Sequence, residues 1–288
     1  ERDNNIIKTL GGKWPHRGEI IFRNVFMKYR QEYGYVLNGL NFTIKAGSKV
    51  GCVGRTGAGK SSIIQALFRM VEIEDLHESY IKIDGVNIRE IGLELLRKNL
   101  SLIPQAAVIF NGSIRRNLDP FGEFSDEELW KVLDEVKLKR TIETLPKGME
   151  TDITIAASVF SAGQKQQVCL ARAILRKSKV IILDEATANV DIETDNLIQE
   201  KINEKFKDCT VLTIAHRLIT IAHYDKALVM DRGNAVEYDV PFLLLVENEN
   251  DTRITKKDGV FAKMVLDSGE AMSRRIFEIA RKTYFENI

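Results

Sequence analysis

Eight consecutive residues near the start of the chain have the types and spacing of a phosphate-binding loop. They are Gly54-Arg55-Thr56-Gly57-Ala58-Gly59-Lys60-Ser61, with Gly-Lys-Ser after an initial glycine and four further residues. Glycines let backbone N–H groups turn toward an anion, and a lysine in this position brings a cation to the outer phosphates. The Ser61 hydroxyl can ligate Mg²⁺, and Ser62 extends the loop. The sequence therefore predicts that residues 54–62 bind the phosphates of a nucleotide together with Mg²⁺.

The motif requires a strand before the loop and a helix after it, and the sequence predicts both. Residues 49–53 are short, mostly apolar and β-prone, which is typical of a buried strand. Apolar residues then recur at helical spacing from Ile63 to Val71. A strand, a glycine loop and a helix in this order would aim the positive end of the helix dipole at the phosphates.

An acidic pair follows a second apolar run. Residues 180–183 are Val-Ile-Ile-Leu, which is typical of a strand buried in a parallel sheet, and Asp184 and Glu185 come next. Ligands of open α/β sheets bind at the carboxyl ends of the strands. At this edge Asp184 could hold Mg²⁺ through water, and Glu185 could polarise a nucleophilic water.

Two further polar residues each follow a predicted strand. Gln105 comes just after residues 102–103 and could contact Mg²⁺ or the attacking water. His216 comes after a strand predicted at 210–215 and could hydrogen-bond a γ-phosphate or the water. Alone, each would be an ordinary loop residue. The phosphate loop upstream favours a role in catalysis for both.

An aromatic residue precedes the phosphate loop. Strands predicted at 19–29 and 36–44 should form a β-rich layer beside the main sheet. Tyr29 ends the first of them. It either packs on the core or provides a platform on which an adenine ring stacks. Its position relative to the phosphate loop favours the platform.

The middle of the chain has a helical pattern from residue 113 to residue 175. Ser125 and Glu128 form a capping box, and Ser161 is placed to cap a helix over 163–175. We expect a helical subdomain inserted between strands of the main sheet. Beyond it, the pattern predicts a helix at 194–206, a hairpin around 232–234 and an amphipathic terminal helix that packs on its own domain.

The composition narrows the class of protein. The chain has 288 residues, of which 44% are hydrophobic, and a net charge of +1 that gives no indication of a nucleic-acid partner. Its three cysteines are dispersed, which fits a reducing compartment. No apolar run approaches the ~20 residues that span a bilayer. Residues 1–18 are polar and are predicted to be a linker, and we expect the chain to be a piece of a longer protein.

Together these features resemble the nucleotide-binding domain of an ATP-binding cassette (ABC) protein. The distinguishing run is Phe160-Ser161-Ala162-Gly163-Gln164, similar to the signature usually written Leu-Ser-Gly-Gly-Gln, although Ala162 replaces a glycine. The resemblance covers about residues 17–268. It implies an α/β P-loop NTPase core with a mostly parallel sheet, an antiparallel β-subdomain and an α-helical subdomain that carries the signature. It also implies ATP-binding roles for Ser161, Gly163, Gln164 and Asp191.

A narrower resemblance is to the second nucleotide-binding domain of C-type exporters, the multidrug-resistance-associated proteins. It depends on Trp14-Pro15 ahead of residues 18–20, on the exact form of the phosphate loop, and on glutamate at 185. It implies an ATPase domain at 19–268, followed by a terminal helix at 269–288, on the cytosolic face of a membrane. The implied partners are a second nucleotide-binding domain, expected in the first half of the same polypeptide, and transmembrane domains.

Other functions of the same fold remain open at this point. A regulatory nucleotide-binding module of an ABC-type channel or channel regulator would carry the same acid pair. An ABC ATPase that acts on DNA is disfavoured, because such proteins usually carry long coiled-coil arms and the sequence has no extended heptad tract.

Overall fold

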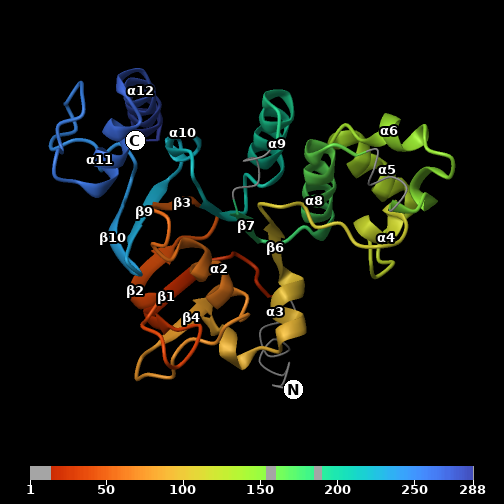
Figure 1. The fold of residues 1–288 in the computed structure, drawn as a ribbon, viewed down its shortest axis with the longest axis horizontal. Coiled ribbons are helices and arrows are strands. Elements are labelled where there is room, and N and C mark those ends of the chain that lie inside the picture. The colour runs from red at the N-terminus through yellow and green to blue at the C-terminus, as the bar shows by residue number, and fades with distance from the viewer. Residues whose placement is uncertain (1–13, 154–159, 185–189, 288) are drawn as a thin grey trace.

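The computed structural model describes residues 14–153, 160–184 and 190–287, which form two sheets and a set of covering helices (Figure 1). The larger sheet has the strand order β10-β9-β3-β8-β7-β6, and within it only the β9–β10 pair is antiparallel. The strands are β3 (Lys49–Gly54), β6 (Leu100–Ile103), β7 (Val180–Asp184), β8 (Thr210–Ile214), β9 (Lys226–Asp231) and β10 (Asn234–Asp239). The predicted mostly parallel sheet is confirmed.

The smaller sheet is antiparallel and has the order β2-β1-β4-β5. Its strands are β1 (Ile20–Met27), β2 (Leu37–Ile44), β4 (Tyr80–Ile83) and β5 (Val86–Asn87). Asp84 and Gly85 join β4 to β5 with φ of 48° and 79°, as a two-residue hairpin turn requires. The predicted β-rich layer is confirmed. However, β1 ends at Met27, so Tyr29 lies in the loop beyond the strand rather than at its end.

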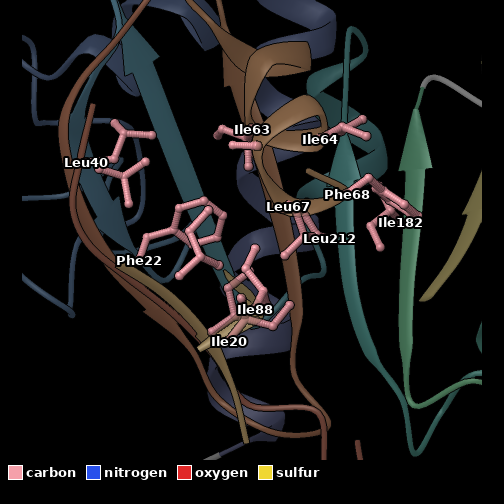
Figure 2. Packing of buried hydrophobic residues seen from close by; sticks show 14 of the residues in the cluster. Ile20, Phe22, Leu40, Ile63, Ile64, Leu67, Phe68, Ile88, Ile182 and Leu212 are labelled. Atoms are coloured by element: carbon pink, nitrogen blue, oxygen red, sulfur yellow. The ribbon is translucent and has the colours of Figure 1, made fainter. Parts of the chain in front are cut away.

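Helix α2 (Lys60–Leu67) lies between the two sheets (Figure 2). Its Ile63 and Leu67 belong to one buried cluster with Phe22 of the smaller sheet and with Ile182 and Leu212 of the larger one. Burying each such side chain contributes about 1.5–3 kcal/mol. The helix that begins at the phosphate loop is therefore fixed from both sides. The short helices η1 (Ile88–Glu90) and α3 (Leu93–Asn99) follow the smaller sheet.

The helical region packs on the opposite face of the main sheet. Side chains alternate along a strand, so Ile181 and Val211 point away from Ile182 and Leu212 and join a second cluster. The helices of this region are α4 (Ile114–Leu118), α5 (Asp126–Glu135), α6 (Lys139–Glu143), η2 (Gly148–Glu150), α8 (Ala162–Arg176) and α9 (Ile192–Lys205). Both helix starts predicted from capping residues are confirmed, with a capping box at Ser125 and another at Ser161.

The C-terminal helices form a third packed group, at one end of the molecule in Figure 1. They are α10 (Leu218–Ile221), α11 (Val260–Asp267) and α12 (Glu270–Glu286). Ile276, Phe277 and Ala280 of α12 are buried in a cluster with Phe242 and Phe261, so the terminal helix packs on its own domain. In the described part of the chain, no helix combines the length and apolarity needed to cross a bilayer.

The last residues of the predicted linker are attached to the smaller sheet. Trp14 is buried, and its Nε1 donates a hydrogen bond of 2.9 Å to the carbonyl of Ile83. The backbone N–H groups of residues 16–19 all donate to the Asp84 carboxylate, at 2.8–3.0 Å. Residues 14–18 are thus part of the folded domain, because one carboxylate beside a hairpin turn satisfies four consecutive donors.

Replacing Asp84 by asparagine is expected to destabilise the fold by about 1.5–3 kcal/mol at pH 7, the range for hydrogen bonds to a charged group. Burial alone would raise the pKa of Asp84, but the four backbone donors outweigh it and hold that pKa below its ordinary value of 3.8. A lowered folded-state pKa stabilises the fold above the unfolded-state pKa, and this contribution disappears as pH falls through the folded-state value.

Urea unfolding midpoints at pH 7 and near pH 3 would measure this effect. The difference between the unmodified chain and Asp84→Asn should shrink at the lower pH. Asp75→Asn is the control, because the Asp75 side chain is 97% exposed and should change stability little although it pairs with Arg89. A difference between the unmodified chain and Asp84→Asn that is equal at both pH values would contradict the role given to the Asp84 charge.

Candidate nucleotide-binding site

The strand register brings the predicted site residues to one edge of the main sheet. Cys52 of β3 pairs with Ile214 of β8, which pairs with Asp184 of β7. On the other side of β7, Leu183 pairs with Ile103 of β6. The carboxyl ends of these adjacent parallel strands therefore lie at one edge of the sheet. The phosphate loop, Asp184, Gln105 and His216 are all located at or just after these strand ends. Gln105 and His216 are exposed there and Asp184 is half-buried, while Glu185 lies outside the described residues.

The backbone of the phosphate loop depends on its glycines. Gly54 has φ of 155°, and a Cβ at this residue would lie 2.3 Å from the carbonyl oxygen of Met230. Gly59 has φ of 99°, and a Cβ there would lie 2.8 Å from the carbonyl oxygen of Val36. The loop thus passes close to β9 and to the start of β2. It can do so only without side chains at these two positions.

Lys60 lies inside this loop as the first residue of α2. Its side chain is buried, and its Nζ donates hydrogen bonds to the carbonyls of Gly54 at 2.7 Å and of Arg55 at 3.0 Å. An ammonium group has three donors, so the lysine can turn a further N–H to an anion without leaving the loop. The structure thus places a cation within a ring of backbone groups at a helix N-terminus, an arrangement suited to phosphate.

Tyr29 reaches the same loop from the smaller sheet. Its hydroxyl lies 2.9 Å from the hydroxyl of Ser62, while the residue is 52% exposed. The ring is therefore exposed, which argues against the alternative interpretation that Tyr29 packs on the core. An exposed aromatic face beside the phosphate loop is suited to stacking on a base, and the stacking itself stays a prediction.

The oxygen donors at this edge are compatible with Mg²⁺. Ser61 is exposed at the start of α2, and Asp184 and Gln105 follow β7 and β6. Mg²⁺ prefers oxygen ligands, and it is commonly held by one or two carboxylates together with substrate phosphates. Within residues 14–153, 160–184 and 190–287, no group of three or more His, Cys, Asp or Glu side chains forms a metal cage. The oxygen atoms of Ser61, Asp184 and Gln105 are of the kind that Mg²⁺ binds, and this donor set fits the ion.

The signature residues lie at the start of α8, beside the start of α9. Ser161 caps α8, with Gln164 N donating to its Oγ at 3.2 Å and Gln164 Oε1 accepting from Ser161 N at 3.0 Å. Asp191 caps α9 by accepting from Thr194 N at 2.9 Å. A Cβ on Gly163 would lie 3.0 Å from the Thr194 side chain and 3.3 Å from an Asp191 oxygen. Gly163 thus allows the two helix starts to approach closely.

The predicted site residues lie in two separate groups in the described part of the chain. Among the described residues, no hydrogen bond links residues 161–164 to the phosphate loop at 54–62. The loop, Tyr29, Asp184, Gln105 and His216 belong to one group. The signature residues and Asp191 form another.

Sequence reasoning missed the side chains that hold the loop after β6. Gln166 is 2% exposed, and its Nε2 donates to the Pro104 carbonyl at 2.8 Å. Arg172 donates to the Val108 carbonyl. A signal was present, because Gln166 shares a helix face with Leu170 and Ala173 by its spacing, and a polar residue on an apolar face indicates a specific partner.

Comparisons with known proteins show the family of the chain. The family described as ABC transporter matches residues 37–188, more than half of the chain. ATP-binding cassette sub-family C member 4 of Homo sapiens is 53% identical over 273 residues, covering 95% of this chain and 20% of that protein. Probable multidrug resistance-associated protein lethal(2)03659 of Drosophila melanogaster is 47% identical, covering 94% and 19%. The chain spans about a fifth of the length of these relatives.

A solved structure is similar in fold as well as in sequence. A bacterial Atm1-family ABC exporter with ATP bound superposes with a TM-score of 0.77 at 32% identity, covering 88% of this chain and 42% of the exporter chain. The predicted P-loop NTPase fold is therefore confirmed. With its phosphate loop and signature helix, the chain belongs to the ABC transporter family, and it is similar in sequence to the sub-family C and multidrug resistance-associated members named above.

Proposed function

We propose that this chain is the ATP-driven motor of a C-type membrane exporter and closes head-to-tail with a second nucleotide-binding domain around two ATP molecules. Binding and hydrolysis of ATP are the activity of the family to which the chain belongs. The proposal adds three features to this activity. They are the arrangement with a partner domain, the attachment to transmembrane domains and the position on the cytosolic face of a membrane.

The observation that carries the proposal is the separation of the signature residues from the phosphate loop. Ser161 and Gly163 start α8, whereas Lys60 starts α2 on the other face of the main sheet. In the head-to-tail pair, each ATP lies between the phosphate loop of one domain and the signature of the other. The signature residues of this chain would then serve the nucleotide of its partner.

The residues of the chain divide the chemistry among them. The loop N–H groups and Lys60 bind the phosphates, and Tyr29 stacks on the adenine. Bound Mg²⁺, held by Ser61, Asp184 and Gln105, would neutralise phosphate charge. Glu185 accepts a proton from the attacking water, and His216 hydrogen-bonds the γ-phosphate. Closure excludes water from the site, and loss of the γ-phosphate after hydrolysis lets the pair reopen.

Adding the partner domain is expected to raise ATP turnover by about tenfold or more, because charge-assisted hydrogen bonds from its signature contribute about 1.5–3 kcal/mol. The chain alone should bind MgATP and hydrolyse it slowly. Phosphate release measured with and without the partner tests this, and a Glu185→Gln chain mixed with the same partner reports the turnover that belongs to the partner itself.

No acceleration with a correctly folded partner would count against the head-to-tail arrangement. In the full-length protein, stimulation of ATP turnover by a transported compound distinguishes an exporter from a regulatory module. A regulatory module would hydrolyse ATP without that response.

A further inference from the structure

The loop that carries Gln105 is held by side chains of the helical region. It leaves β6 at Ile103 and runs to α4. At the start of the loop, the amide of the buried residue Gln166 donates to the carbonyl of Pro104 at 2.8 Å. Pro104 is the residue next to Gln105. Gln166 belongs to α8, whose first turn contains the signature residues.

The same loop has two more attachments to the helical region. Arg172 of α8 donates to the carbonyl of Val108. Asn117 of α4 accepts from Phe110 N and donates to Phe110 O, both at 2.8 Å, and its Oδ1 also accepts from Arg172 Nη2 at 2.7 Å. Asn117 is 1% exposed, whereas the loop residues that it and Arg172 hold, Phe110 and Val108, are exposed. The backbone of residues 104–110 is therefore bonded at three points to α8 or to a side chain that α8 holds.

These attachments join two regions with different tasks. Gln166 lies five residues after Ser161, about 7 Å along the helix axis. Because Gln166 is buried, breaking its hydrogen bond would leave a buried amide donor without a partner, which is costly. A displacement of the signature turn is therefore expected to displace Pro104 as well. Since Gln105 is the next residue, its distance from the nucleotide follows the position of α8.

We propose that Gln166 is a positioning residue, which couples the signature turn of this chain to Gln105 in the chain's own ATP site. The inference rests on the proposed function, because the signature turn contacts a nucleotide only in the head-to-tail pair. When the partner's ATP draws the signature turn inward, Gln166 moves Gln105 with it. Occupancy of one site thereby adjusts the catalytic geometry of the other.

The test compares Gln166→Met with the unmodified chain, each assembled with its partner domain. Methionine keeps the length of the side chain and removes the donor to Pro104. The kcat for ATP should fall by about 10- to 100-fold, the effect of misplacing a catalytic group by about 1 Å, while KM and the Kd for MgATP stay within about twofold. Gln166→Leu, which also lacks the donor, should give the same result and replaces the methionine variant if that one folds poorly.

Gln167→Met is the matched control. Gln167 is buried to a similar degree, at 7% exposure, and in the described part of the chain it makes no hydrogen bond to residues 104–110. This variant should keep a normal kcat. A fall in kcat equal to that of Gln166→Met would show that any change in this part of the helix has the effect, and would overturn the proposal.

A double substitution separates positioning from a general structural role. In a Gln105→Ala chain, adding Gln166→Met should cost less than about twofold more, because the group that Gln166 positions is already gone. Losses that multiply, or a Gln166→Met chain with normal kcat, would overturn the inference. If the unmodified pair failed to hydrolyse ATP at all, the proposed function would fall instead.

Discussion

Replacing Glu185 by glutamine is expected to lower ATP turnover by about 10²–10⁴, the range for loss of a general base, while MgATP still binds. Glutamine has the shape of glutamate but cannot take up the proton of an attacking water. Glu185 itself lies outside the described residues, but its neighbour Asp184 ends β7 in register with Ile214 of β8. That register places Asp184 at the edge where the phosphate loop begins.

Two measurements on the same preparation would check this result. Steady-state phosphate release, with the partner domain present, reports turnover, and titration with a fluorescent ATP analogue reports binding. Glu127→Gln is the control, since this exposed residue in the first turn of α5 undergoes the same chemical change in the helical region, and the variant should turn over within twofold of normal. Near-normal turnover of Glu185→Gln would remove Glu185 from the role of base.

Replacing Lys60 by alanine is expected to weaken MgATP binding by about 10- to 100-fold. The basis is a charge-assisted hydrogen bond to phosphate, which contributes about 1.5–3 kcal/mol. In the structure Lys60 Nζ is held within the loop by the carbonyls of Gly54 and Arg55, so the cation is already in place before the nucleotide arrives. The substitution therefore acts on binding itself, in contrast to Glu185→Gln.

Calorimetric titration of the folded chain with MgATP measures this loss directly. Lys49→Ala serves as the control, because Lys49 begins the same strand, β3, and its Nζ bonds Asn203 at 2.9 Å at the opposite edge of the sheet. It should bind MgATP as the unmodified chain does. An unchanged Kd in Lys60→Ala would contradict the phosphate-binding role of the loop, and so would an equal loss in Lys49→Ala.

The sequence by itself determined the features whose signals are local. The phosphate loop is one continuous run, so its motif can be recognised without knowledge of the rest of the fold. The helix starts at Ser125 and Ser161 are predictable because a capping side chain acts within its own first turn, and at Ser125 the residue Glu128 completes a capping box. The buried strand β7 followed from four consecutive apolar residues. In each case the signal is contained in a short run of the chain.

The tertiary structure alone decided which distant groups meet. Gln166 bonds Pro104 across 62 residues of chain, and Asp84 gathers the N–H groups of residues 16–19 from 65 residues or more away. The hydroxyls of Tyr29 and Ser62 meet because β1 packs against α2, and β1 proved to end before Tyr29. A single sequence contains the residues that make such contacts but does not show which of them contact each other. The pairing is set by strand register and by packing of the sheets on α2 and α8.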